Sequence, residues 1–274
     1  MTTTTSDSGV IDVGTTQLYY EVRGHGPTLL LISGGGGDAG LWGKLVPPLA
    51  EDFMVVTYDR RGYSRSPRPA DWTTTSVDEQ ADDAAALLRR LDLAPAVTVG
   101  HSSGASIVCS LVARHPQVVR HAVSYEPPLL AVIPQGEQVV GGFRAAIEQA
   151  MAEGGPRRAM EIFIRANAGD EGFEHWWASN EPAMRERMME NAAVFFEVEL
   201  PAVAKFVPDG VAIRASGVPL TVVVGADNRD TWFGAAADWL VAEAGAHRGE
   251  LPGGHAGFDS HPDAFVNLVR QLSR

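Results

Sequence analysis

The chain has 274 residues, with 34 acidic and 22 basic side chains and a formal charge of −12 at pH 7. This length suits one large domain, and the negative field repels polyanions, so nucleic acid is not an expected partner. The longest apolar runs fall far short of the roughly 18 residues of a membrane span, and residues 1–8 show no signal-peptide pattern. The single cysteine cannot form an internal disulfide, which suits a reducing compartment. We therefore expect a cytoplasmic protein with no membrane segment; whether it is a homodimer stays open.

Strands and helices are predicted to alternate along residues 1–133. The segments 10–13 and 17–22, separated by Gly14-Thr15-Thr16, suggest an opening hairpin. The runs that follow are apolar on both faces, as in parallel strands covered by helices, and lie at 28–32, 54–58, 96–99 and 122–125. Ser76-Val77-Asp78-Glu79 is a capping box that opens an amphipathic helix. This alternation predicts an α/β class with a mostly parallel sheet.

A different pattern covers residues 134–218, which hold five of the seven methionines and six of the ten phenylalanines. Stretches with helical periodicity lie there at 139–152, 157–166 and 181–192. The α/β pattern then resumes, with strands expected at 220–224 and 248–251 and helices at 235–244 and 263–272. We therefore predict a core formed by residues 1–133 and 219–274, and a helical cap formed by residues 134–218.

Several large apolar side chains of the predicted cap are candidates for lining a substrate pocket. They are Trp176, Trp177, Met188, Phe195 and Phe196. Any one of them could belong to the cap's own core, but the group is larger than a small helical layer needs. The sequence therefore predicts an apolar pocket beneath the cap and leaves open which of these residues line it.

The segment Val97–Gly104 predicts where the chemistry takes place. It reads Val-Thr-Val-Gly-His-Ser-Ser-Gly, a β-type run that ends in Gly-x-Ser-x-Gly and precedes a helix-favouring stretch. A serine on such a strand-to-helix turn is pushed out of the sheet, and Gly100 and Gly104 avoid a clash across the turn. Ser102 is therefore the candidate nucleophile, and the alternative is an incidental Ser/Gly turn. Cys109, on the following helix, is expected to be a packed core thiol.

The glycine-rich segment Ser33–Asp38 follows the strand predicted at 28–32. Without side chains, its backbone N–H groups could approach a ligand closely, which suits an oxyanion hole. A rival interpretation exists, because Gly35–Gly40 fits Gly-x-Gly-x-x-Gly and Asp59 closes the next strand, as in a dinucleotide-binding fingerprint. Pro47-Pro48 inside the required helix, and the late position of this strand in the chain, argue against that interpretation.

His255 is the histidine best placed to act as a general base. It lies in the glycine-flanked loop Leu251–Phe258, after the last predicted strand. His101 is adjacent to Ser102 but is expected to point the wrong way along the strand. The turn Asp59–Ser66 is expected to be structural, with its Asp and Arg side chains paired locally. No Cys, His and Asp cluster has the spacing of a metal site, so neither a metal nor an organic cofactor is expected.

The order of these motifs resembles the α/β-hydrolase superfamily over essentially the whole chain. An oxyanion loop, an Asp-x-Arg-Gly-x-x-x-Ser turn, a nucleophile elbow, a helical insertion and a Gly-His loop follow one another as in that family. Gly100–Ala105, Glu126-Pro127-Pro128 and the Leu-Pro-Gly-Gly-His loop, with residues 260–265, look most like the zearalenone-type lactonases and their bacterial relatives. The resemblance implies an eight-stranded, mostly parallel sheet with helices on both faces and an inserted helical cap.

The same resemblance implies a set of site residues. The nucleophile, acid and histidine would fall on Ser102, Glu126 and His255. The oxyanion donors would be the backbone N–H groups of Gly35 and Ser103, and Gly36 of the same loop is a candidate substrate contact. The chain departs from the commoner superfamily pattern at Ser33, where a histidine usually precedes the glycines.

Two positions compete for the triad acid. Many members of the superfamily carry it three residues after the equivalent of Gly225, but here that position is Asn228, whose amide cannot stabilise an imidazolium by charge. Asp227 is one residue out of frame and should point elsewhere. Glu126 closes the strand at 122–125, and two prolines stiffen the chain behind it. We therefore predict that Glu126, not Asp227, is the acid.

Together these residues predict a serine hydrolase that cleaves a carboxylic ester or lactone of an apolar, aromatic small molecule. Ser102 would attack the carbonyl, His255 would take its proton, Glu126 would orient the imidazole, and water would then hydrolyse the acyl-enzyme. Two other classes stay open. One is a nicotinamide-dependent oxidoreductase that uses the Gly35–Gly40 loop, and the other is a non-catalytic small-molecule receptor on the same fold.

Overall fold

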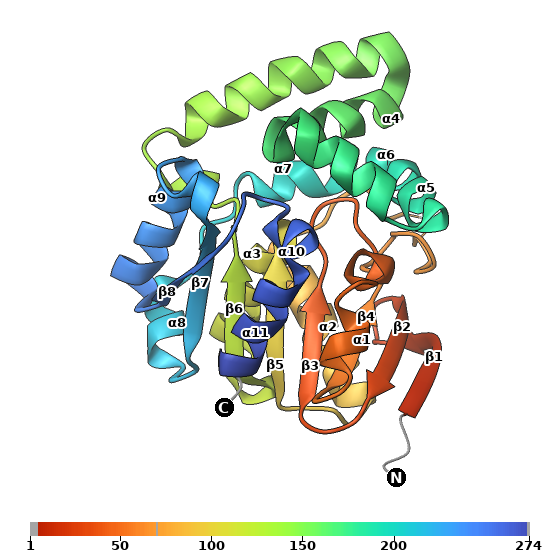
Figure 1. Ribbon diagram of the computed structural model, residues 1–274, viewed down its shortest axis with the longest axis vertical. Coiled ribbons are helices and arrows are strands. Elements are labelled where there is room, and N and C mark those ends of the chain that lie inside the picture. The colour runs from red at the N-terminus through yellow and green to blue at the C-terminus, as the bar shows by residue number, and fades with distance from the viewer. Residues whose placement is uncertain (1–4, 70, 273–274) are drawn as a thin grey trace.

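The computed structural model describes residues 5–69 and 71–272, and these residues form one eight-stranded sheet (Figure 1). The strands are β1 (Thr5–Asp12), β2 (Gln17–Gly24), β3 (Thr28–Ile32), β4 (Met54–Tyr58), β5 (Ala96–His101), β6 (Val119–Tyr125), β7 (Leu220–Gly225) and β8 (His247–Leu251). Their spatial order is β1–β2–β4–β3–β5–β6–β7–β8. β1 and β2 form an antiparallel hairpin, β2 pairs antiparallel with β4, and the remaining pairs are parallel. The predicted hairpin and mostly parallel sheet are confirmed.

β3 shows why the strands read as continuous apolar runs. Its residues Leu29, Leu30, Leu31 and Ile32 are all fully buried. Because side chains alternate across a strand, Leu29 and Leu31 join one apolar cluster, and Leu30 and Ile32 join another on the opposite face. The sheet is therefore the middle layer of the core, with apolar packing on both sides.

Helices cover both faces of the sheet, as predicted. One face carries α2 (Val77–Arg90), α3 (Ser103–Arg114), α8 (Gly210–Ala215) and α9 (Trp232–Trp239), and the other carries α1 (Val46–Leu49) and α11 (Pro262–Leu272). The shorter elements are η1 (Ala39–Trp42), η2 (Pro116–Val118), η3 (Leu130–Val132), η5 (Ala226–Asn228), η6 (Leu240–Ala244) and α10 (Gly257–Ser260). α2 begins as its capping box predicts, because Ser76 Oγ accepts a hydrogen bond from the N–H of Glu79 (2.9 Å).

The segment after β6 forms a helical layer over the carboxyl ends of the parallel strands (Figure 1). It comprises α4 (Gly136–Ser179), α5 (Pro182–Glu190), α6 (Ala192–Val194), η4 (Phe195–Glu199) and α7 (Leu200–Val203). α4 is interrupted at Gly155 and Gly169, whose φ values of 71° and 75° lie outside the helical region. Although α4 is long, no helix within residues 5–69 and 71–272 is both long and apolar enough to cross a membrane. η4 is a π-helical turn, a form that is frequent at functional sites.

The chain returns from this layer to β7 through α8. Ile213 of α8 belongs to the larger core cluster, and α8 contacts α3 and η6. The predicted cap range of 134–218 includes α8, but α8 packs as a helix that covers the sheet. We therefore propose that the cap ends before Gly210 and that α8 is part of the core.

Candidate active site

Ser102 lies on the sharp turn between β5 and α3. Its φ of 55° and ψ of −125° are rare for a residue with a side chain, and this strained geometry is typical of a nucleophile elbow. The flanking glycines are required by sterics. A Cβ atom on Gly100 would lie 2.7 Å from the backbone nitrogen of Ala105, and one on Gly104 would lie 2.7 Å from the carbonyl oxygen of Ser33. The segment therefore has the strand, turn and helix that its motif predicts.

Glu126 and His255 form a buried pair beside this elbow. The N–H of Ser102 donates to the carbonyl of Tyr125 (2.9 Å), which places the next residue, Glu126, close to the turn. His255 Nδ1 lies 2.7 Å from Glu126 Oε2. Because a carboxylate can only accept, the proton is on Nδ1 and Nε2 is left with the lone pair of a base. The structure thus brings together the predicted acid and the predicted histidine, which come from the ends of different strands.

Further donors hold the Glu126 carboxylate in place. The N–H of Gly225 donates to Oε1 (2.8 Å), and Asn228 Nδ2 lies 3.0 Å from each of the two oxygens. Glu126 is fully buried, whereas Asp227, the competing candidate for the acid, is exposed. Sequence reasoning ruled out Asn228 as an acid but missed its role as a donor to the acid on the neighbouring strand. These contacts favour Glu126 over Asp227.

His101 supports the loop that carries His255. Its Nε2 donates to the backbone carbonyl of His255 (3.0 Å), and the two rings lie 4.5 Å apart between centroids. His101 thus contacts the loop after β8, which folds back over the end of β5, and the expectation that His101 is not the base stays a prediction. Burial, followed by the proximity of His255, lowers the pKa of His101 well below its usual value. His101 is therefore a neutral packing partner of the loop.

The loop after β3 packs closely against the elbow. A Cβ atom on Gly34 would lie 3.0 Å from Cβ of Ser102, so a side chain at this position would crowd the nucleophile. Ser103 begins α3, and the first N–H groups of a helix have no partner within the helix. Ser103 also lines the cavity described below. The loop and the helix terminus are therefore both next to Ser102.

Two N–H groups of the glycine loop are already occupied. The N–H of Gly37 donates to the carbonyl of Gly34 (3.1 Å), and that of Gly36 hydrogen-bonds to the hydroxyl of Tyr63. For the N–H of Gly35, the described part of the chain provides no acceptor. Gly35 is therefore a donor of this loop that is left for a ligand.

The dinucleotide-binding interpretation does not fit the structure. After the glycine loop the chain forms only the short η1 and α1, not the long helix whose N-terminus would hold a pyrophosphate. Asp59, the candidate for binding a ribose, is fully buried. Its carboxylate accepts from the N–H of Ala39 (2.9 Å) and from the guanidinium of Arg65 (2.7 and 2.8 Å). The local Asp–Arg pairing predicted for this turn is confirmed, and Asp59 is not available to a ligand.

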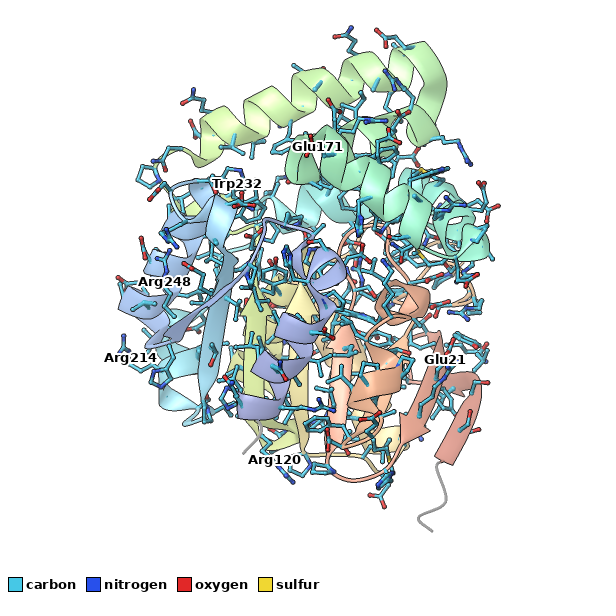
Figure 2. All side chains as sticks on the ribbon, in the orientation of Figure 1. Glu21, Arg120, Glu171, Arg214, Trp232 and Arg248 are labelled. Carbon is cyan, nitrogen blue, oxygen red and sulfur yellow. The ribbon has the colours of Figure 1, made fainter. Side chains whose placement is uncertain are left out.

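A cavity of about 1070 Å³ lies beneath the cap and includes Ser102 and Ser103 in its lining. Its large apolar wall residues include Leu130, Phe143, Phe163, Phe195, Phe196, Leu200, Trp232 and Phe233, and its charged ones are Glu137, Arg144, Glu148 and Lys205. Trp232 lies at the end of the core that faces the cap (Figure 2), and Phe233 stacks on the ring of His255 at 4.6 Å. The size and the wall suit an apolar small molecule.

The predicted pocket residues divide between this cavity and the interior of the cap. Phe195 and Phe196, in η4, line the cavity. Trp176 and Trp177 lie instead in the apolar cluster of the cap, where the Trp177 ring stacks on Phe173 at 5.7 Å. The prediction that the two tryptophans line the pocket is therefore corrected, because they face the packing between cap helices.

Met188 and Gly36 are also placed away from the cavity wall. Met188 packs at the edge of the cap cluster. Gly36 lies beneath the cap, since a Cβ atom there would lie 2.7 Å from Cε of Met160. Both residues therefore help to join the cap to the glycine loop, and a contact of either with the substrate stays a prediction. Sequence reasoning missed Phe163, Phe233 and other wall residues, because no local pattern marks them.

Comparison with known proteins agrees with the fold and the motifs. Residues 27–151 match the family model described as alpha/beta hydrolase fold. Over 272 residues the chain is 30% identical to the uncharacterized hydrolase YraK of Bacillus subtilis, covering 98% of this chain and 96% of the relative. The protein therefore belongs to the α/β-hydrolase superfamily and is a hydrolase.

One further relative in sequence and one solved structure of the same fold are similar to this chain. The chain is 29% identical over 264 residues to the zearalenone hydrolase of Bionectria ochroleuca, covering 93% of each chain. The crystal structure of the enol-lactonase from Burkholderia xenovorans superposes with a TM-score of 0.72 at 20% identity, covering 97% of this chain and 99% of that one. The sequence similarity confirms the resemblance to zearalenone-type lactonases, and the superposition shows a shared fold.

Proposed function

We propose that this protein is a serine hydrolase that cleaves a carboxylic ester or lactone through an acyl-enzyme. The observation that carries the proposal is the contact of 2.7 Å between His255 and the buried carboxylate of Glu126, next to an elbow that presents Ser102. A buried carboxylate that holds a histidine in one tautomer, beside a serine on a strained turn, is the arrangement of a catalytic triad.

The chemistry follows from these roles. Ser102 Oγ bonds to the carbonyl carbon while His255 Nε2 takes its proton, and the charge of Glu126 stabilises the resulting imidazolium. The backbone N–H groups of Gly35 and Ser103 donate to the oxyanion. His255 then gives its proton to the leaving alcohol as the ester bond breaks. Water attacks the acyl-enzyme with the same histidine as its base, which restores Ser102, and no step calls for a cofactor.

The cavity supports an apolar, aromatic and uncharged substrate. Phenylalanine rings from both the cap and the core line it, among them Phe163, Phe196 and Phe233. The formal charge of −12 disfavours an anionic substrate. Relatives described as a zearalenone hydrolase and an enol-lactonase support the inclusion of cyclic esters among the substrates.

The test is a panel of p-nitrophenyl esters, simple lactones and an aromatic macrolactone, with Ser102→Ala as the blank. We expect turnover of aromatic esters or lactones by the wild type and a loss on the order of 10⁴-fold or more in the variant. A variant that keeps a tenth of the activity would reject Ser102 as the nucleophile. Tight binding without turnover by the wild type would favour a small-molecule receptor instead.

A further inference from the structure

Arg60 is a buried cation next to the glycine loop. It is 1% exposed and lies in the turn Asp59–Ser66, for which the sequence indicates only a structural role. Its Nη2 donates to the carbonyl oxygen of Gly34 (2.8 Å), and its Nη1 donates to Gln80 Oε1 (2.6 Å) and pairs with Glu199 Oε1 (2.8 Å). The guanidinium therefore joins the glycine loop to a carboxylate of the cap.

The carbonyl that Arg60 holds belongs to the same peptide group as the N–H of Gly35. In a planar trans peptide the C=O and the N–H point in opposite directions, so a donor that fixes the carbonyl also fixes the direction of the N–H. Within the described loop, the next N–H groups, on Gly36 and Gly37, are occupied. Arg60 thus acts on a peptide of this loop whose N–H has no hydrogen-bond acceptor among the described residues.

We propose that Arg60 is a positioning residue of this hydrolase, which fixes and polarises the Gly34–Gly35 peptide so that its N–H binds the oxyanion. This inference rests on the proposed serine-hydrolase function. A hydrogen bond from a cation to the carbonyl draws electron density from the peptide nitrogen, so the N–H becomes a stronger donor. Arg60 itself does not touch the substrate.

A carboxylate from the cap keeps this cation in place. Burial opposes the charge on Arg60, but Glu199 and Tyr63 raise the pKa of Arg60 above its usual value, so the guanidinium stays protonated. The hydroxyl of Tyr63 donates to the other oxygen of Glu199 and hydrogen-bonds with the N–H of Gly36. One carboxylate therefore supports the loop at two points, at Gly34 through Arg60 and at Gly36 through Tyr63.

Glu199 also links the loop to the wall of the cavity. It ends η4, the turn that carries Phe195 and Phe196. The ring of Phe195 covers the loop, since a Cβ atom on Gly35 would lie 2.7 Å from its Cζ. The turn that shapes the pocket and the peptide that binds the oxyanion are therefore held by the same buried ion pair.

Arg60→Lys tests this role, with Arg61→Lys as its matched control. A lysine keeps the charge, but its ammonium cannot bridge Gly34 and Glu199 as the forked guanidinium does. Arg61 follows Arg60 in the same turn, is 4% exposed and pairs with Asp83 of α2, and its polar contacts lie away from the glycine loop. We expect Arg60→Lys to lower kcat roughly 10- to 100-fold with KM changed less than about threefold, and Arg61→Lys to leave both near wild type.

Binding of an aryl trifluoromethyl ketone distinguishes a loss of oxyanion-hole positioning from general damage to the pocket. Ser102 adds to its carbonyl and forms an oxyanion, so its affinity reports the oxyanion hole, whereas ester binding in a Ser102→Ala background reports the pocket alone. We expect Arg60→Lys to weaken the ketone roughly 10- to 100-fold, in parallel with kcat, and to leave ester binding unchanged. If Arg60→Lys does not fold, the double variant Arg60→Met with Glu199→Leu, which removes both buried charges, is expected to show the same losses.

The outcomes distinguish this inference from the proposed function. Equal ketone affinities of the Arg60→Lys and Arg61→Lys proteins would overturn the role of Arg60 and leave the serine-hydrolase proposal intact. Equal losses of ketone and ester affinity would also overturn it, because they indicate a deformed pocket. A wild-type protein that neither turns over an ester nor binds the ketone overturns the proposed function and this inference with it.

Discussion

Replacing Glu126 by glutamine tests the assignment of the triad acid. Its two carboxylate oxygens receive contacts from His255 Nδ1 (2.7 Å), the N–H of Gly225 (2.8 Å) and Asn228 Nδ2 (3.0 Å to each). In glutamine one oxygen becomes an NH₂ group, and in either orientation this group faces a donor. If it faces His255, Nδ1 must accept, so the ring proton moves to Nε2 and the base is lost. If it faces Gly225, the imidazolium still lacks its counter-charge.

We therefore expect Glu126→Gln to lower kcat by roughly 10² to 10⁴, which corresponds to about 2.7 to 5.4 kcal/mol of added barrier. Asp227→Asn is the matched control, because it also exchanges a carboxylate for an amide but at an exposed position. It should cost less than about tenfold. Both kcat values are measured on one ester at one pH, with thermal denaturation to show that each variant is folded. The reverse ranking would refute the reasoning, move the acid to the loop after β7, and leave Glu126 a structural residue.

Three further predictions concern the pocket, the support of the histidine loop and the elbow. Phe196→Ala should shift the ratio of kcat/KM between aryl and short-chain p-nitrophenyl esters by roughly tenfold, because Phe196 lines the cavity. Trp177→Ala, at a position away from the cavity, should leave this ratio unchanged. Equal shifts in both variants would contradict the assignment of Phe196 to the cavity wall. Because the pKa of buried His101 lies well below 6.5, the unfolded chain binds the extra proton, and stability should fall by up to about 1.4 kcal/mol per pH unit below about pH 6.5. Urea titrations at pH 5.5 and 7 should show a smaller loss for His101→Gln; an equal loss would assign the effect to other groups. Gly104→Ala should prevent cooperative folding, because its Cβ would meet the backbone at the end of β3. Gly141→Ala, where a Cβ would lie in open space, should not destabilise the protein. Thermal denaturation measures both variants, and two equal melting curves would contradict the steric argument.

Local sequence predicts those parts of the molecule that local chemistry determines. β3 reads as a continuous apolar run because both of its faces are covered. The turn at Ser102 can be predicted from the sequence because its geometry requires glycine at positions 100 and 104, where neighbouring backbone leaves no room for a side chain. The contact between Glu126 and His255 is predictable for a similar reason, since the frame of a strand end determines which residue can face the histidine loop.

The wall of the cavity could not be predicted in the same way. Trp176 and Phe196 are both large, apolar and part of the cap, yet Trp176 packs between cap helices and Phe196 faces the cavity. Phe196 lies in the π-helical turn η4, whose wider spacing departs from the helical period used to assign faces. Likewise, Tyr63 and Glu199 are 136 residues apart in the chain, and no periodic pattern connects positions at that separation.

The cap is inserted in the crossover between two neighbouring parallel strands, β6 and β7, with α8 as the helix that completes the crossover. Relatives can therefore diverge by exchanging whole caps, because the strand ends keep their positions whatever chain joins them. The pair of Arg60 and Glu199 restricts this exchange. A transplanted cap without a carboxylate in that place would leave a buried guanidinium without its counter-charge, a defect of several kcal/mol. New substrate preferences should thus evolve in caps that keep a carboxylate at the position of Glu199 and change the aromatic residues that line the cavity.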